Sequence, residues 1–455
     1  METPPILTPF RFKLSYGTNV TLKLLFVGLL TLVLLIPTVW IFSLIDERQH
    51  RAESVVAEIS QKWAGRQTLV GPILVIPYIV SETRVNASGN EYTVQRTENA
   101  YFLPDQLTIT GEVEPEVLSR GIFDAVVYRS TVSTQATFKA PDFDGLGVSP
   151  ENVQWANARY VVGLNDLRGI SGTPVITVGG SKLETEQIAD IYKRSDVNEY
   201  SAMPGIVLKT RWSSAADFQP DVALTIDFKG SQSLEFVPAG KETKVSLTGT
   251  WGNPSFDGKF LPETRTVTEK DFAASWSILH YNRPFPQQWT GTQTTLEGSR
   301  FGVNLLVPVD QYQKSTRAAK YAILIILLTF VSLFMVEIIR KVRIHPFQYA
   351  LIGVALIIYY TLLLSISEHL GFNVAYWIAT IATVLLVAWY ARTFLPDSSN
   401  TIFFSLMLTL FYAFIFVIIM QQDFALLTGS IGLFLVVAAL MYFSRKITWY
   451  KEAEA

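Results

Sequence analysis

Five long apolar stretches fill the last third of the chain. Each is 19 to 22 residues long, and together they cover residues 321–339, 349–367, 370–391, 401–422 and 424–444. A helix needs about 20 apolar residues to cross the hydrocarbon core of a bilayer, where its backbone groups must bond to one another. The pattern therefore predicts five transmembrane helices, and the short connections between them make successive helices antiparallel neighbours.

A sixth apolar run, residues 24–45, follows the basic residues Arg11, Lys13 and Lys23. A cleaved signal peptide is the competing interpretation, but its apolar region usually has about 7 to 15 residues and ends at a small-residue cleavage site. The run here has 22 residues and is followed by charged ones. We therefore expect an uncleaved signal anchor, in which Pro37 favours a bend because it lacks an N–H donor.

Helical periodicity continues beyond the anchor, over residues 47–64. Val55, Val56, Ile59 and Trp63 recur at helical spacing, which predicts an amphipathic helix that docks on the next domain. Residues 69–80 contain two prolines and are predicted to be an extended segment that these prolines interrupt.

From there to about residue 313 the apolar residues alternate with a period of two. The clearest alternations cover 222–228, 245–251, 272–278 and 301–307, and clusters of turn residues separate them. This pattern is typical of half-buried antiparallel strands and predicts a large all-β, sandwich-like domain. A short helix is expected at 184–193. Because about 270 residues is long for one sandwich, two subdomains divided near 195–204 are an alternative to a single one.

The composition limits the partners and the kinds of chemical site that the chain is expected to have. The net charge is −2, which favours no nucleic-acid partner, and the chain has no cysteine, which excludes disulfides and thiol chemistry. Only four histidines occur, and they are widely spaced: His50, His280, His345 and His369. We therefore expect no metal site and no cofactor.

The distribution of basic residues predicts the orientation in the membrane, because lysine and arginine beside short loops stay in the cytoplasm. An inside N-terminus places ten basic residues on the cytoplasmic side: Arg11, Lys13, Lys23, Arg340, Lys341, Arg343, Arg392, Arg445, Lys446 and Lys451. The predicted arrangement has six transmembrane helices, with both termini in the cytoplasm and the β-rich domain across the membrane. Its parts are a cytoplasmic segment 1–23, the anchor 24–45, the β-rich domain with its leading helix 46–320, the five-helix bundle 321–444 and a cytoplasmic tail 445–455.

Several motifs resemble those of a known family. They include Leu69-Val70-Gly71-Pro72, Asp166, Arg168-Gly169, Pro254-Ser255-Phe256, Asp310-Gln311-Tyr312-Gln313, His345-Pro346 and Ser367-Glu368-His369. Through these motifs nearly the whole chain resembles the CreD family of bacterial inner-membrane proteins. The resemblance implies a role in cell-envelope integrity and an expression controlled by a two-component system. It implies no catalytic residue, because the family has none assigned.

Glu337 is the only acidic or basic residue inside the five spans. Ionisable residues within a membrane are costly and are functional candidates by default. A local pair with Arg340 or Lys341, three or four residues further along the helix, is the favoured interpretation.

Two groups of residues invite a catalytic interpretation. Ser365, Ser367, Glu368 and His369 would suit an intramembrane hydrolase or a proton relay, but a helix turn at the lipid–water boundary uses the same residue types. His280 would suit a serine–histidine–aspartate triad, but the nucleophile motif Gly-x-Ser-x-Gly is missing, and a packed histidine is the favoured interpretation.

Lys314, Arg317 and Lys320 recur every three residues just before the first of the five spans. Scattered charges that contact only water are the favoured interpretation, and the sharper hypothesis is that these residues meet the acidic outer turns at Glu368 and Asp423 and so seat the β domain on the bundle. Anionic lipid headgroups are a further alternative partner of this basic face.

These observations favour a non-enzymatic protein whose exported β domain binds an envelope protein, a cell-wall component or a lipid. A transporter or lipid-handling protein that uses the helix bundle is the alternative. The bilayer is the one partner that the pattern itself implies, and the oligomeric state stays open.

Overall fold

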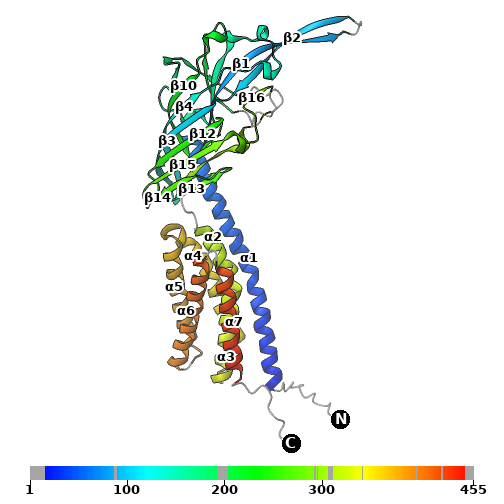
Figure 1. Ribbon diagram of the computed structural model, residues 1–455. Helices are drawn as coiled ribbons and strands as arrows, with labels where there is room; N and C mark the ends of the chain where they lie inside the picture. Colours follow the sequence, from blue (N-terminus) through cyan, green and yellow to red (C-terminus); the bar gives the residue numbers. More distant parts are fainter. Residues whose placement is uncertain are drawn as a thin grey trace, which may run out of the picture. The chain divides into compact units, whose positions relative to one another are not determined.

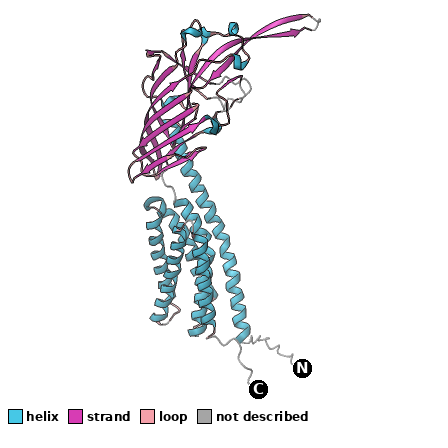
Figure 2. Ribbon diagram, viewed as in Figure 1, coloured by secondary structure: helices cyan, strands magenta, loops and turns pink. Residues whose placement is uncertain are grey.

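The computed structural model describes the chain except for residues 1–15, 87–89, 192–202, 292–293, 295, 306–310, 341, 396, 422–423 and 446–455. The chain forms two compact units. The helical unit comprises Met1–Ala52 and Val309–Ala455, and the β unit comprises Glu53–Pro308. Figure 2 shows that regular structure in the first is helical, whereas strands dominate the second.

The helices are α1 (Tyr16–Trp63), α2 (Gln311–Lys320), α3 (Ala322–Arg340), α4 (Pro346–Leu370), α5 (Phe372–Ala391), α6 (Ser398–Met420) and α7 (Ala425–Ser444). Five of these, α1 and α3 to α6, are long and apolar enough to cross a membrane. In α7 the described apolar stretch, Leu427–Ala438, is shorter. The prediction that the chain has membrane-spanning helices is therefore confirmed, and the sixth span stays a prediction.

The surface of the helical unit is rich in large apolar side chains. Leu25 and Trp40 on α1 are 69% and 72% exposed, and Leu385 and Trp389 on α5 are 63% and 71% exposed. Such side chains are favourable when lipid, rather than water, surrounds them. The buried faces meet closely at Gly353 of α4, where a Cβ atom would lie 2.3 Å from Cδ1 of Leu34 in α1.

The strands form two sheets, which Figure 1 shows together in the β unit. The first sheet has the order β13-β17-β11-β1-β5-β9-β8, with β2 paired to β1 and β16 paired to β2; the second has the order β14-β15-β12-β3-β4-β10-β6-β7. The strands of the first sheet are β1 (Gln67–Val85), β2 (Glu91–Phe102), β5 (Arg159–Leu164), β8 (Thr185–Ile188), β9 (Gly205–Lys209), β11 (Ser233–Phe236), β13 (Pro254–Gly258), β16 (Gln288–Thr290) and β17 (Phe301–Leu305). Those of the second are β3 (Gln106–Arg120), β4 (Phe123–Thr137), β6 (Val175–Val178), β7 (Ser181–Lys182), β10 (Asp221–Ser231), β12 (Glu242–Gly249), β14 (Thr264–Val267) and β15 (Phe272–Leu279).

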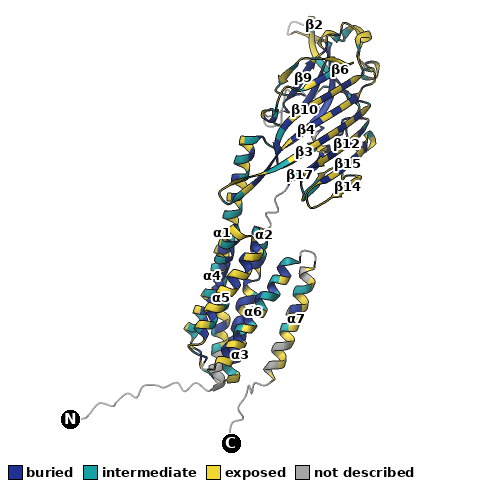
Figure 3. Ribbon diagram, turned by 90° about the vertical axis from the view of Figure 1, so that its left-hand side faces the viewer, coloured by how far each residue is buried: buried dark blue, intermediate teal, exposed yellow. Residues whose placement is uncertain are grey.

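One connected apolar core lies between the sheets. Its side chains come from both, for example Val75 and Phe236 from the first and Val132 and Trp276 from the second. Along β10 and β12 buried and exposed residues alternate strictly over most of the strand, as Figure 3 shows. The period-two pattern of the sequence therefore arises from sheets with one face in the core and one in water.

Three features differ from the sequence prediction. The helix predicted at 184–193 is wrong: β8 begins at Thr185 and pairs antiparallel with β9, so sheet pairing overrides local helix propensity. The segment 69–80 lies in the continuous strand β1. The pairing of β1 with β5 shifts register between Val70 and Ile73, where Pro72 lies. Two pairings, β1 with β11 and β3 with β12, are parallel. The proposed subdomain boundary at 195–204 lies mostly outside the described residues.

The leading helix docks on the β unit as its periodicity predicts. The indole of Trp63, in the last turn of α1, is contacted by the Lys229 ammonium 4.7 Å from its centroid and by the Arg129 guanidinium at 5.7 Å. Just beyond the helix, Gly65 donates its N–H to the Asp166 carboxylate at 3.0 Å. These contacts fix the end of α1 to β4, β10 and the turn that follows β5.

Strands β1 and β2 extend beyond the rest of their sheet as a two-stranded arm, visible in Figure 1. We call residues 79–86 and 90–97 the hairpin arm. From Ile79 to Val85 the arm is roughly 23 Å long at the usual rise of a strand. Among the described residues no third strand pairs with it, so both of its outer edges are open.

Candidate functional site

The intramembrane acid Glu337 joins α3 to α1 and α4. Its carboxylate forms an ion pair with the Lys23 ammonium of α1 and accepts hydrogen bonds from the Tyr349 hydroxyl at 3.0 Å and the Ile344 N–H at 3.3 Å. Lys23 also donates to the Ile344 carbonyl at 2.7 Å. The sequence favoured Arg340 or Lys341 as partner; Lys341 lies outside the described residues, and the structure supplies a cation from another helix instead. The N-terminal part of α1 is thereby held against the connection between α3 and α4.

A second acid, Glu368, contacts α1 further along the helix, at Arg48. Its carboxylate accepts two hydrogen bonds from the Arg48 guanidinium, at 2.8 and 2.5 Å. It accepts a third from the Tyr312 hydroxyl at 3.0 Å. Its side chain is 5% exposed, so these three donors satisfy a carboxylate that water hardly reaches. Burial, reinforced by the neighbouring carboxylate, raises the pKa of Tyr312 to about 12, which keeps the phenol protonated as a donor.

The spacing of the two clusters matches a membrane. Lys23 and Arg48 are 25 residues apart on α1, roughly 37 Å along a helix. The hydrocarbon core of a bilayer is about 30 Å thick. Each cluster therefore falls near one boundary of the hydrocarbon, where a charged pair retains some water. Together the clusters fasten α1 to the bundle at both boundaries; we call them the Glu337 clamp and the Glu368 clamp.

The structure places the remaining predicted contact residues as follows. Lys314, Arg317 and Lys320 all lie on α2, which belongs to the helical unit. The residue of α2 that contacts Glu368 is Tyr312. Asp423 lies outside the described residues. The idea that this basic face seats the β domain stays a prediction.

The hydroxyl and imidazole groups beside Glu368 do not form a nucleophile–base pair in the described part of the chain. The buried Ser367 hydroxyl donates to the Leu364 carbonyl at 2.8 Å, as hydroxyls within helices commonly do. Ser365 and His369 are exposed. The arrangement is that of a helix end, stabilised by the Glu368 clamp.

His280 begins a short turn after β15. Its ring lies 3.9 Å from that of Tyr281, centroid to centroid, and its buried Nδ1 has no hydrogen-bond partner in the described part of the protein. In a catalytic triad this nitrogen is bound to a carboxylate. The geometry is that of a packed histidine.

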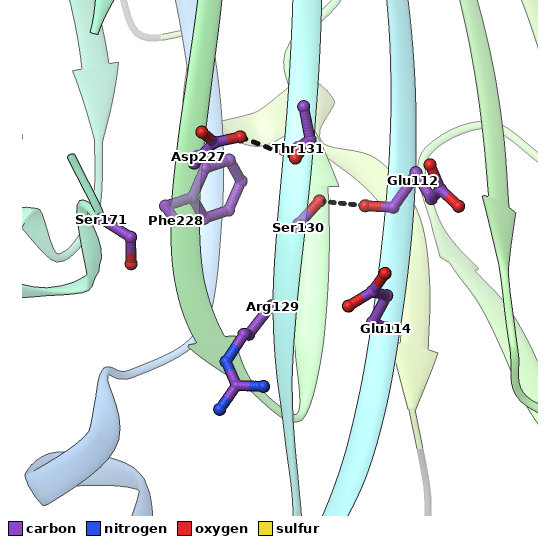
Figure 4. A pocket seen from close by; sticks show the side chains of 8 residues that line it. All are labelled: Glu112, Glu114, Arg129, Ser130, Thr131, Ser171, Asp227 and Phe228. Atoms are coloured by element: carbon purple, nitrogen blue, oxygen red, sulfur yellow. Dashed lines mark hydrogen bonds between the residues drawn. The ribbon is translucent and has the colours of Figure 1, made fainter. Parts of the chain in front are cut away.

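Figure 4 shows a shallow hollow on the second sheet of the β unit. Its lining comprises Glu112, Glu114, Arg129, Ser130, Thr131, Ser171, Asp227 and Phe228. Two lining groups are already bonded: Thr131 donates to Asp227 at 2.6 Å and Ser130 to the Glu112 carbonyl at 2.7 Å. At about 230 Å³ the hollow is smaller than typical small-molecule pockets of about 300–1,000 Å³. No group of three or more candidate metal ligands occurs among the described residues.

Sequence reasoning found both acids but missed their partners. The sequence pattern marks Lys23 only as a basic residue that sets the orientation, and it gives Arg48, one of the charged residues after the anchor, no role. The one available signal was their spacing, which places one basic residue at each end of the apolar part of α1. The hairpin arm was missed because alternation does not reveal how far a strand pair projects.

The comparisons with known proteins agree on one family. The family model described as "Inner membrane protein CreD" matches residues 19–450. The curated protein "Inner membrane protein CreD" of Escherichia coli (strain K12) is 31% identical over 427 residues, which cover 92% of this chain and 91% of that protein. The membrane helices, the β-rich domain and the motifs around Tyr312 and Glu368 extend over the same length. The chain therefore belongs to the CreD family of inner-membrane proteins.

Proposed function

We propose that this inner-membrane protein contributes to cell-envelope integrity by binding a partner protein of the envelope through its β unit, without catalysing a reaction. In this proposal both termini are cytoplasmic and the β unit lies in the periplasm. The support for that orientation is the charge distribution: the described Arg340, Arg343 and Arg392 flank ends of the spans on the side of Lys23.

The hairpin arm is the observation that carries the binding proposal. An isolated two-stranded hairpin is only marginally stable in water, and open strand edges are templates for pairing with another chain. Here an ion pair joins the two strands of the arm, since Arg96 on β2 contacts Glu82 on β1 at 3.1 Å. Near its end the arm exposes Val85 (64%) and Tyr92 (48%). A projecting, internally braced arm with open edges and exposed apolar residues fits partner binding by strand addition.

The test is a functional assay of the full-length chain in a bacterium that lacks its own copy. The double variant Val85→Asp and Tyr92→Asp should remove protection against envelope-damaging detergent while the protein level stays unchanged. The matched control is Val175→Asp with Val267→Asp, since both valines are 47% exposed on strands outside the arm. A photo-crosslinking residue at the neighbouring exposed position 93 should give a discrete adduct in the otherwise unchanged chain, and the adduct should be lost when the two arm substitutions are added.

Equal protection by the arm variant and the control variant would refute the role of the arm. If only substitutions in the helical unit affected protection, the lipid-handling or transport alternative would be favoured.

A further inference from the structure

A groove between α5 and α6 is a feature that the proposed function does not use. It encloses about 500 Å³ and is lined by the last two turns of α5 and the first three turns of α6. Leu385 and Trp389 form one wall and Ile402 and Leu406 the other, and all four are more than 60% exposed. Its size falls within the usual range of ligand pockets, and its walls suit an apolar ligand.

One end of the groove is polar and positive. Arg392 lies there at the end of α5, and within the described residues its guanidinium forms no ion pair and no hydrogen bond. Opposite it α6 begins at Ser398, so free N–H groups and the positive end of the helix dipole point toward the same place.

A second observation also indicates a ligand. Thr401 lines the groove, and its Oγ1 atom is buried and has no hydrogen-bond partner among the described residues. Its neighbours on the same helix face are satisfied, because Ser405 donates to the Thr401 carbonyl at 2.8 Å and Thr409 to the Ser405 carbonyl at 2.9 Å. A buried hydroxyl without a partner is costly, and a bound acceptor would remove that cost.

The depth of the groove corresponds to one leaflet of a bilayer. From Ser398 to Thr409 the lining covers 12 residues, roughly 16 Å along α6. Half of the hydrocarbon core is about 15 Å. The positive end lies at the helix termini, where headgroups are found, and the apolar walls lie where acyl chains are found.

We propose that the α5–α6 groove is a binding site for an acidic phospholipid. The phosphodiester is bound by Arg392, the first turn of α6 and the Thr401 hydroxyl, and an acyl chain lies against Trp389 and Ile402. The Asp397 carboxylate does not line the groove, accepts a hydrogen bond from the Asn400 amide at 3.3 Å, and forms no ion pair with Arg392 in the described part of the chain. This site requires neither the hairpin arm nor a particular orientation in the membrane.

The test is native mass spectrometry of the purified full-length chain titrated with phosphatidylglycerol, with phosphatidylcholine of the same acyl chains for comparison. The wild type should retain phosphatidylglycerol more tightly. Arg392→Gln should weaken this retention about five-fold, because a basic residue near an anionic headgroup contributes about 1 kcal/mol. Thr401→Val, which keeps the side-chain shape, should weaken it about two-fold.

Two further variants serve as a control outside the groove and as an independent way to block it. Arg340→Gln removes an exposed basic residue at the end of α3, outside the groove, and should leave retention unchanged. Ala388→Phe fills the groove and should lower the retention of phosphatidylglycerol even if Arg392→Gln fails to fold. Equal retention of both lipids, equal losses for Arg392→Gln and Arg340→Gln, or pairing of two chains through the groove would each overturn the proposal.

Discussion

At the scale of single residues, two carboxylates determine how the anchor helix is held. The chain separates Glu337 from Lys23 by 314 residues and Glu368 from Arg48 by 320, so each contact depends on the tertiary fold. Periodicity and composition could mark Glu337 as unusual. They could not name its partner, because nothing local in the sequence encodes which helix lies beside which.

The Glu368 clamp gives a first prediction at this scale. Glu368→Gln should destabilise the full-length chain by about 1–2 kcal/mol, because Arg48 loses its ionic partner while Tyr312 keeps an acceptor. Arg48→Gln should cost a similar amount, and the double variant should cost less than the sum of the two. Thermal unfolding in detergent measures all three, with the exposed Lys320→Gln as control. Additive losses would show that the contact is not coupled.

Asp166 gives a second prediction, in the β unit. Hydrogen bonds from Arg168, at 2.9 and 2.7 Å, and from the Gly65 N–H lower the pKa of this carboxyl. A lowered folded-state pKa means that the charged form is stabilised by folding; this contribution is present above the unfolded pKa near 4 and is lost as the pH falls below it.

Asp166→Asn should therefore lower the free energy of unfolding by about 1–2 kcal/mol at pH 7 and by clearly less near pH 3. Tryptophan fluorescence of the full-length chain during thermal unfolding reports the change, and Asp144→Asn, at an exposed position, is the control. A loss that is the same at both pH values would contradict the assigned role of the charge.

At the scale of elements, long periodic segments were predictable and their termini and partners were not. The strands around 222–228 and 272–278 follow directly from alternation, because one face of each is buried. The helix expected at 184–193 failed because local propensity there is weaker than pairing with β9. The parallel pairing of β3 with β12 joins strands distant in sequence, which no local pattern reports.

The packing of α1 on α4 gives the prediction at this scale. Gly353 lets Leu34 approach the α4 backbone, and Phe330 of α3 lies 3.0 Å from the position that a Cβ would occupy. Gly353→Leu should therefore separate α1 from the bundle and lower the melting temperature of the chain in detergent. Val354→Leu, one residue further on an exposed position, should have little effect. Equal stability of the two variants would contradict the close packing.

At the scale of the whole molecule, the protein consists of a helical unit with membrane-spanning helices and a β unit, and α1 contributes residues to both. The sequence predicted this division because apolar runs of about 20 residues and period-two alternation are both strong signals. It did not predict the α5–α6 groove, since a groove depends on how two helices splay apart. Our central proposal is that the β unit is periplasmic and that the ends of α3 and α5 that carry Arg340 and Arg392 are cytoplasmic.

The absence of cysteine from the chain makes this claim directly testable. Single cysteines are introduced at the exposed positions Ser133 and Lys244 in the β unit and at Thr393 just after α5, and cells are treated with a membrane-impermeant maleimide. The account predicts labelling of Ser133→Cys and Lys244→Cys in cells with a permeabilised outer membrane, and of Thr393→Cys only after the inner membrane is lysed. Labelling of Thr393→Cys before lysis, with the β-unit cysteines protected, would contradict it.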